Sequence, residues 1–228
     1  MKTKTFFECQ ACGHQSPKWL GRCPDCGDWN SFQEEKLHKE SASSSTRSGF
    51  GIKDVKSKRA QNLNEIESES VARVPIGIPE LDRVFGGGIV PGSLVLVGGD
   101  PGIGKSTLLL QLGLQVSKNE TVLYVSGEES PNQVKLRANR IVQKQRSDHF
   151  LVYSETHFEK ILEEVKSQKP SFLVIDSIQT VYTETLNSAP GSVSQVREVS
   201  SLLMNLAKAN QITIFIIGHV TKIGRAHV

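Results

Sequence analysis

Short apolar runs alternate with amphipathic stretches through the second half of the chain, and this pattern predicts the fold. Five runs rich in Val, Ile and Leu have the length of buried strands, at residues 94–97, 121–125, 150–153, 172–176 and 212–217. Between them, helical spacing begins near residue 105 and at Pro131, and covers residues 157–167 and 193–209. The alternation predicts an α/β fold, a mainly parallel sheet with helices on both faces.

The spacing of apolar residues also indicates which side of three helices faces the core. The predicted inward residues are Leu108, Leu109 and Leu112, then Ile161, Leu162 and Val165, and finally Val196, Val199, Leu203 and Leu206. The segment 183–192 has few apolar anchors and contains Pro190-Gly191, which predicts a mobile loop.

The first quarter of the chain lacks this alternation and divides into two parts. Residues 1–33 contain all four cysteines, which predicts a small metal-stabilised module. Residues 34–57 are rich in Ser and poor in apolar residues, the composition of a flexible linker. Globular patterning restarts with Leu63 and Ile66, so residues 58–228 are assigned to the α/β domain.

Composition and charge exclude only a few functional classes of protein. The chain has 228 residues, 37% of them hydrophobic, which suffices for a substantial core. A formal net charge of +3 permits a nucleic-acid partner without requiring one. The first residues lack the apolar run of a signal peptide, and no run has transmembrane length. We therefore expect a cytoplasmic protein with no membrane partner.

The cysteines form two C-x-x-C pairs, Cys9 with Cys12 and Cys23 with Cys26. Four thiolates at this spacing predict one tetrahedral Zn²⁺ site, because each pair can bend around one ion. A redox role for a C-x-x-C pair is the less favoured alternative. The aromatic residues of the module are Trp19, Trp29 and Phe32; we expect them to pack around its small core, the alternative being stacking on nucleic-acid bases.

The strongest motif follows the first predicted strand. Residues 99–106, GDPGIGKS, match the phosphate-loop pattern G-x-x-x-x-G-K-[ST]. The expected nucleotide-binding residues are Gly99, Asp100, Pro101, Gly102, Ile103, Gly104, Lys105, Ser106 and Thr107. Glycines let backbone N–H groups point into one concavity, Lys105 supplies charge for the β- and γ-phosphates, and Ser106 suits Mg²⁺. A Gly-rich connecting turn is the alternative interpretation.

Other candidate site residues stand at the carboxyl ends of predicted strands, where ligands gather in a parallel sheet. Asp176 is expected to hold the Mg²⁺ shell through water, and Glu128 or Glu129 to orient the attacking water. Helix capping is the alternative role for the two glutamates. His219 can sense the γ-phosphate, or it can be structural.

A run of basic residues follows Pro131: Lys135, Arg137, Arg140, Lys144 and Arg146. Most such runs form a solvated helix face, which is the interpretation favoured here. Contact with a nucleic acid or a nucleotide is the alternative.

The combination of motifs resembles one known family. A four-cysteine module followed by LDRVFGGGIVPGSLVLVGGDPGIGKSTLLLQ, YVSGEES, FLVIDSIQT and GHVTK resembles the bacterial RadA (Sms) family, and more distantly RecA and the DnaB-type helicases. The resemblance implies a RecA-like P-loop core behind a zinc ribbon, and a DNA-dependent ATPase that works in recombinational DNA repair. It implies a homo-hexameric ring acting on single-stranded or branched DNA, with recombinase filaments as a further partner. It places the catalytic glutamate at Glu128, and makes residues 183–195 similar to a DNA-facing loop.

The chain departs from that family pattern at its end. The family continues past the last strand into a further motif and a Lon-protease-like domain, and residues 223–228 do not follow the family sequence. We therefore expect this chain to bind nucleotide without appreciable DNA-stimulated turnover. If such turnover is found, Arg197 and Lys222 are the first cationic residues to mutate.

Two rival functions remain open at this stage. One is an ATP-controlled DNA clamp without motor activity, and the other is a P-loop kinase of the KaiC type. Transfer of label from ATP would favour the kinase, whereas strand displacement would favour the motor. GTPase activity is disfavoured because the sequence has no N-K-x-D motif.

Overall fold

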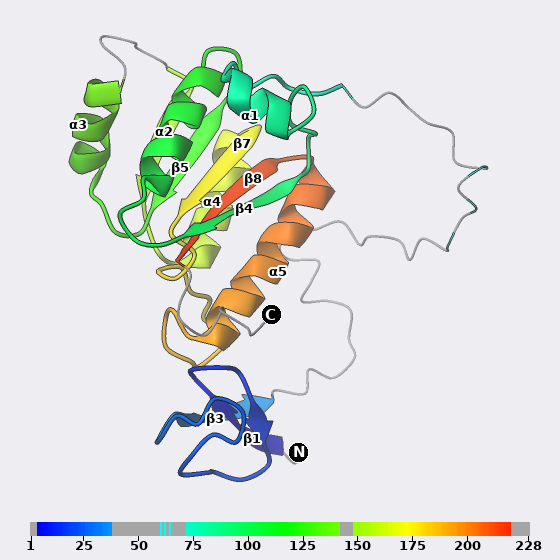
Figure 1. The fold of residues 1–228 in the computed structure, drawn as a ribbon, viewed down its shortest axis with the longest axis vertical. Coiled ribbons are helices and arrows are strands. Elements are labelled where there is room, and N and C mark those ends of the chain that lie inside the picture. Colours follow the sequence, from blue (N-terminus) through cyan, green and yellow to red (C-terminus); the bar gives the residue numbers. More distant parts are fainter. Residues whose placement is uncertain are drawn as a thin grey trace.

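The computed structural model describes residues 4–37, 60, 62, 64, 72–141 and 148–219. Within these residues the chain forms a small antiparallel sheet at the amino-terminal end and a larger parallel sheet flanked by helices (Figure 1). This is the predicted architecture, an α/β core preceded by a four-cysteine ribbon. None of the described helices is long and apolar enough to cross a membrane.

The ribbon has three strands in the order β2-β1-β3: β1 is Lys4–Cys9, β2 is Gln15–Ser16 and β3 is Phe32–Leu37. Both neighbours pair antiparallel with β1, and the β1–β3 register sets Cys9 opposite Phe32. Strand β3 continues beyond residue 33 to Leu37 and stays paired with β1 along its length. The rest of the predicted linker, with Leu63 and Ile66, lies outside the described residues.

The larger sheet contains five parallel strands in the order β4-β8-β7-β5-β6. The strands are β4 (Leu94–Gly99), β5 (Val122–Ser126), β6 (Phe150–Ser154), β7 (Phe172–Asp176) and β8 (Thr213–His219). All five predicted strands are confirmed, with small shifts at their ends. The central strands are buried on both faces, as expected for a parallel sheet covered by helices.

Helices cover both faces of this sheet (Figure 1). The helices are α1 (Pro79–Val84), α2 (Lys105–Val116), α3 (Pro131–Ile141), α4 (Phe158–Gln168) and α5 (Val193–Asn210). One core cluster joins α4 and α5 to one face, and a second joins α2 and residues of α1 and α3 to the other. Alternate residues of β5 enter the two clusters, Leu123 the first and Tyr124 the second, because strand side chains alternate.

Helix α2 differs from the prediction at one position. Leu109 and Leu112 are buried, but Leu108 is 37% exposed, and its expected place in the core is taken by Leu110, which is 0% exposed. The reason is that α2 buries a broad stripe that also includes Gly113, Leu114 and Val116. The three leucines at positions 108–110 span too wide an arc of the helix for all of them to face the sheet.

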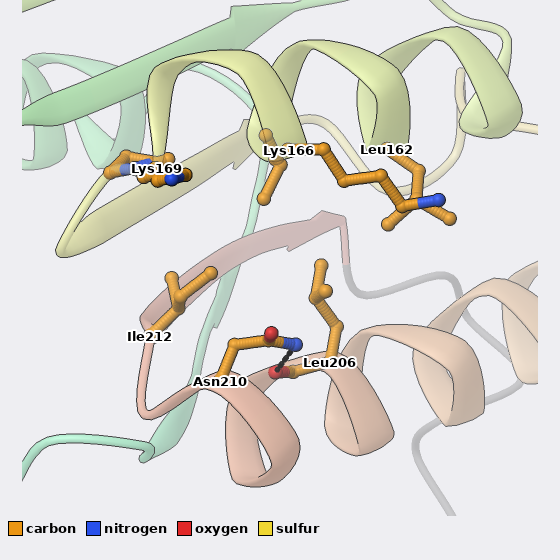
Figure 2. A pocket seen from close by; sticks show the side chains of 8 residues that line it. Leu162, Lys166, Lys169, Leu206, Asn210 and Ile212 are labelled. Carbon is orange, nitrogen blue, oxygen red and sulfur yellow. Dashed lines mark hydrogen bonds between the residues drawn. The ribbon is translucent and has the colours of Figure 1, made fainter. Parts of the chain in front are cut away.

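A groove lies between the carboxyl-terminal turns of α4 and α5 (Figure 2). Leu162, Leu206 and Ile212 give it an apolar lining, and Lys166 and Lys169 line it as well. The groove has a volume of about 430 Å³. It lies at the amino ends of β7 and β8, the opposite edge of the sheet from the phosphate loop, and it is not part of the site described below.

Candidate functional site

The phosphate loop connects β4 to α2, as the motif predicted. Gly104 precedes the first residue of α2 with a φ of 101°, a left-handed conformation that residues with a Cβ adopt only at a cost. Gly104, the N-cap residue of α2, has no side chain that could accept a hydrogen bond from the first N–H groups of the helix. In loops of this kind these N–H groups bind a phosphate. Asp100, Pro101, Gly102 and Ile103 of the loop are exposed, and so is Thr107 in the first turn.

Lys105 is buried at the base of the loop, with 7% of its surface exposed. Its Nζ donates hydrogen bonds to the carbonyl oxygens of Gly99 at 2.8 Å and Asp100 at 2.9 Å. The ammonium group therefore sits inside the curl of the loop that it helps to close. A cation in this position neutralises phosphate charge, the role predicted for Lys105.

Asp176 ends β7 next to the phosphate loop. Its Oδ1 accepts a hydrogen bond from the Ser106 hydroxyl at 3.1 Å, and its Oδ2 accepts one from the Tyr124 hydroxyl at 2.5 Å. A hydroxyl and a carboxylate are oxygen ligands of the kind that Mg²⁺ takes, directly or through water, so the pair fits the expected magnesium shell. Sequence reasoning gave Tyr124 no role, although this residue opens the YVSGEES segment. The available signal was a polar atom inside an apolar strand.

The two adjacent glutamates have different surroundings. Glu128 Oε1 accepts a hydrogen bond from the Ser177 hydroxyl at 2.9 Å, and the Glu128 side chain remains 55% exposed. Glu129 forms an ion pair with Arg137 of α3, and its backbone N–H donates to Ser126 Oγ at 3.0 Å. Helix capping is not the role of either side chain, because Ser130 and Gln133 bond to each other at the start of α3. Of the two, Glu128 is the one held at the sheet edge and open to solvent.

His219 ends β8, directly beside the first residue of the phosphate loop. It pairs in register with Gly99, and its Nε2 lies 3.8 Å from Glu128 Oε1. Its carbonyl oxygen accepts a hydrogen bond from Gln179 at 3.4 Å. Among the described residues, its buried Nδ1 has no hydrogen-bond partner. The structure thus gathers His219, Glu128 and Ser177 around one point at the carboxyl edge of the sheet.

The prediction for the basic residues that follow Pro131 needs correction. Arg137 does not belong to a solvated basic face, because it is paired with Glu129 and only 17% of its side chain is exposed. Lys135 and Arg140 are exposed as expected, whereas Lys144 and Arg146 lie outside the described residues.

The segment 183–192 is not the weakly anchored loop that its composition predicted. Gln195, 1% exposed, donates from Nε2 to the carbonyl oxygens of Thr183 and Ser188, at 3.0 and 3.1 Å, and accepts from the Thr183 N–H at 2.9 Å. A single side chain near the start of α5 therefore anchors the beginning and the middle of the segment. Composition could not reveal this because the anchor is polar and lies beyond the segment itself.

The four cysteines of the ribbon converge, as predicted. All four Sγ atoms lie within 4.8 Å of one another, with 3.7 Å between Cys9 and Cys26 and 3.5 Å between Cys12 and Cys23. Zinc–sulfur bonds of about 2.3 Å in a tetrahedron would set sulfurs about 3.8 Å apart, so the cluster fits zinc. Burial opposes ionisation of Cys9, but hydrogen bonds from Ser31 and from backbone N–H groups lower its pKa to about 6, whereas burial raises the pKa of Cys12.

The prediction that three aromatic residues pack around the ribbon core holds for one of them. Phe32 is buried beside Cys9 and Cys23. Trp19 and Trp29 are instead 52% and 67% exposed, and the guanidinium carbon of Arg22 lies 5.7 Å from the centre of the Trp29 ring. The ribbon is too thin to enclose three large rings, since the metal cluster and Phe32 already fill its interior. Two large aromatic surfaces with a neighbouring cation remain available to a partner.

The ribbon also approaches the larger domain near α5. A Cβ added at Gly13, in the first cysteine knuckle, would lie 3.1 Å from Val193 Cγ1 and 3.1 Å from an Arg197 guanidinium nitrogen. Gly13 has a φ of +80°, so glycine suits both the backbone and the space. The knuckle therefore contacts the first turn of α5, close to the anchored segment 183–192.

Comparison with known proteins agrees with this geometry. Residues 60–225 match the AAA domain family, and residues 7–34 match the rubredoxin metal binding domain. The chain is similar to the DNA repair protein RadA of Listeria monocytogenes, with 53% identity over 98% of this chain and 48% of that protein. Proteins of the same name from Bacillus subtilis and Streptococcus pyogenes are each 51% identical, again over 98% of this chain and 48% of theirs. The chain thus spans about half the length of these relatives, and the sequence resemblance is confirmed.

Proposed function

The chain belongs to the AAA domain family, and on that premise we propose that it binds ATP with Mg²⁺ and hydrolyses it. The observation that carries the proposal is the convergence of three groups at one edge of the sheet. These groups are Lys105 inside the phosphate loop, the Ser106–Asp176 pair, and Glu128 held by Ser177.

Each group has one task in phosphoryl transfer. Lys105 and the N–H groups at the start of α2 hold the phosphates and offset their charge, while Ser106 and Asp176 hold the magnesium shell. Bound Mg²⁺ would neutralise charge that develops between the β- and γ-phosphates. Glu128 orients a water molecule in line with the γ-phosphate and accepts its proton. His219 senses whether the γ-phosphate is present; its Nε2 lies 3.8 Å from Glu128 Oε1.

We further propose that the protein is a DNA-dependent ATPase that acts in recombinational DNA repair. It works as a ring motor that moves along single-stranded or branched DNA, or branch-migrates it. Support comes from the relatives, which carry the name DNA repair protein, and from the exposed Trp19, Trp29 and Arg22 of the ribbon. Aromatic rings beside cations suit unpaired bases and their phosphates. A homo-hexamer in the cytoplasm, with recombinase filaments as partners, completes the proposal.

The test is the rate of phosphate release with and without an unstructured single-stranded DNA. It is measured on this chain and on a chimera extended by the part of the Listeria monocytogenes relative that lies outside the match. We expect both to bind ATP and the chimera to show DNA-stimulated turnover and strand displacement. Turnover without strand displacement would favour an ATP-controlled clamp, and transfer of label from ATP to protein would favour a kinase. Absence of ATP binding by both would contradict the proposal.

A further inference from the structure

Tyr124 is a buried residue whose hydroxyl contacts the proposed magnesium site, and neither the phosphate-loop motif nor the zinc motif gives it a role. It is 0% exposed and heads the largest fully buried side chains of the described residues. Its ring packs beside that of Phe150, with 6.0 Å between ring centres, in the core under α2 and α3. A phenylalanine would fill this space equally well. The hydroxyl therefore needs a separate explanation, because a buried polar group without a partner is costly.

The register of the sheet brings the hydroxyl to Asp176. Tyr124 of β5 pairs with Val174 of β7, and Asp176 lies two residues further along β7 on the same face. Such diagonal neighbours are about 7–8 Å apart, within reach of an aromatic side chain but not of a short one. The result is the 2.5 Å hydrogen bond from Tyr124 to Asp176 Oδ2.

The direction of this hydrogen bond follows from the chemistry of the two groups. A carboxylate can only accept, so the Tyr124 hydroxyl donates its proton to Asp176 Oδ2. With Oδ2 bound to Tyr124, the other oxygen, Oδ1, faces Ser106 at 3.1 Å. Rotation of the carboxylate would break one of these two bonds. Tyr124 thus limits the orientations of Asp176 to the one that faces the phosphate loop.

Helix α3 is held at the same edge by a second contact. Arg137 of α3 is paired with Glu129, which lies in the turn after β5 and is the neighbour of Glu128. The Tyr124–Asp176 hydrogen bond and this ion pair thus join β7 and α3 to β5 and the turn that follows it.

We propose that Tyr124 is a positioning residue that orients the Asp176 carboxylate toward Ser106 and so sets how tightly the site holds magnesium with nucleotide. The inference rests on the proposed ATP-binding function. Tyr124 acts through Asp176 and touches neither nucleotide nor metal. Removal of the Tyr124 hydroxyl should raise the Mg²⁺ concentration that nucleotide binding requires. The part of the nucleotide affinity that depends on Lys105 and the loop backbone should be kept.

The experiment measures binding of a fluorescent ATP analogue to the 228-residue chain over a range of Mg²⁺ concentrations, and in EDTA. In Tyr124→Phe, affinity in EDTA should stay within about twofold of the parent. The Mg²⁺ concentration for half-maximal binding should rise about tenfold, the loss expected for one hydrogen bond to a charged group. Tyr153→Phe removes a hydroxyl from the adjacent strand β6 and should leave both values unchanged.

Two further variants make the result decisive. Tyr124→Phe added to Asp176→Asn should produce little further change in the Mg²⁺ requirement, because Tyr124 acts only through that carboxylate. Tyr124→Met also lacks the hydroxyl but fills the space with a flexible apolar chain, so it serves if the first variant folds poorly. An unchanged Mg²⁺ requirement in the folded variants, or an equal loss of affinity in EDTA and in Mg²⁺, would overturn the inference. A parent chain that binds no nucleotide in Mg²⁺ would overturn the proposed function itself, which is a distinguishable result.

Discussion

The hydroxyl of Ser177 donates a hydrogen bond to Glu128 Oε1 at 2.9 Å, and this contact separates the roles of two adjacent glutamates. Ser177 is fully buried, so it offers a fixed point from which the exposed carboxylate of Glu128 extends. Glu129 is engaged with Arg137 on the other side of the turn. Only one of the two carboxylates is therefore available to a water molecule beside the phosphate loop.

Glu128→Gln should abolish ATP hydrolysis while leaving ATP binding nearly intact, because an amide keeps the shape of the side chain but cannot accept a proton. We expect turnover to fall at least about a hundredfold, the usual contribution of a general base. Glu129→Gln is the matched control and should retain turnover, with a small loss of stability from the weakened pair with Arg137. The measurement is phosphate release beside equilibrium ATP binding on the extended chimera. The reverse pattern would assign the catalytic role to Glu129.

Zinc should be bound at one equivalent per chain by Cys9, Cys12, Cys23 and Cys26, since their sulfurs already stand at tetrahedral spacing. Cys12→Ser, or a strong chelator, should remove the metal and unfold the ribbon while the ATPase core keeps its fold. His14→Ala is the control, because His14 bonds to Asp25 at 2.8 Å beside the cluster without belonging to it. Metal analysis and hydrogen exchange measure both effects. Much less than one equivalent of zinc in freshly reduced protein would count against the site.

Single-stranded DNA should quench the tryptophan fluorescence of this chain. Both tryptophans lie in the ribbon and are exposed, so the signal reports the ribbon alone. Trp29→Phe should weaken binding by about tenfold or less, and Trp29→Ala by more, because base stacking contributes about 1–3 kcal/mol per aromatic ring. Affinity should also fall steeply with salt and vary little with sequence. An unchanged emission at saturating DNA, with binding shown by another method, would place the contact outside the ribbon.

Leu110→Ala should lower the free energy of unfolding by about 2–5 kcal/mol, because Leu110 is 0% exposed and its loss leaves a cavity between α2 and the sheet. Leu108→Ala, two positions away and 37% exposed, should cost about 1 kcal/mol or less. Urea unfolding of the two variants gives the comparison directly. Equal losses would mean that Leu108 is buried in the folded protein, as its sequence pattern alone suggested.

Gln195→Leu should lower the free energy of unfolding by at least about 2 kcal/mol and increase hydrogen exchange in residues 183–192. The leucine keeps the volume but leaves backbone groups of Thr183 and Ser188 without their buried partner. Gln168→Leu is the control, because the hydrogen bond of Gln168 to Glu164 is exposed, and it should change stability by no more than about 0.5 kcal/mol. If residues 183–192 exchanged equally fast in the parent and in Gln195→Leu, the anchor would have no effect.

Local features of the sequence determined the helices and strands of this protein and the kinds of ligand that we propose for it. The phosphate loop is recognisable in the sequence because phosphate binding needs glycines, Lys105 and Ser106 at fixed spacing within one short segment. The cysteine pairs predict zinc for the same reason, and the apolar runs that became β5 and β7 predict strands because burial on both faces requires them.

Tertiary structure decided every feature that depends on residues far apart in the chain. Tyr124 meets Asp176 across 52 positions and Ser177 meets Glu128 across 49, through the register and order of parallel strands, which no local pattern records. Packing left Trp29 exposed and Leu110 buried, because the space available in a thin ribbon or beneath α2 is set by the neighbouring elements. The ion pair between Arg137 and Glu129 exists only in the folded protein, because it joins α3 to the turn that follows β5. Spacing along the chain specifies which chemistry is present, whereas contacts across the fold specify which residues carry it out.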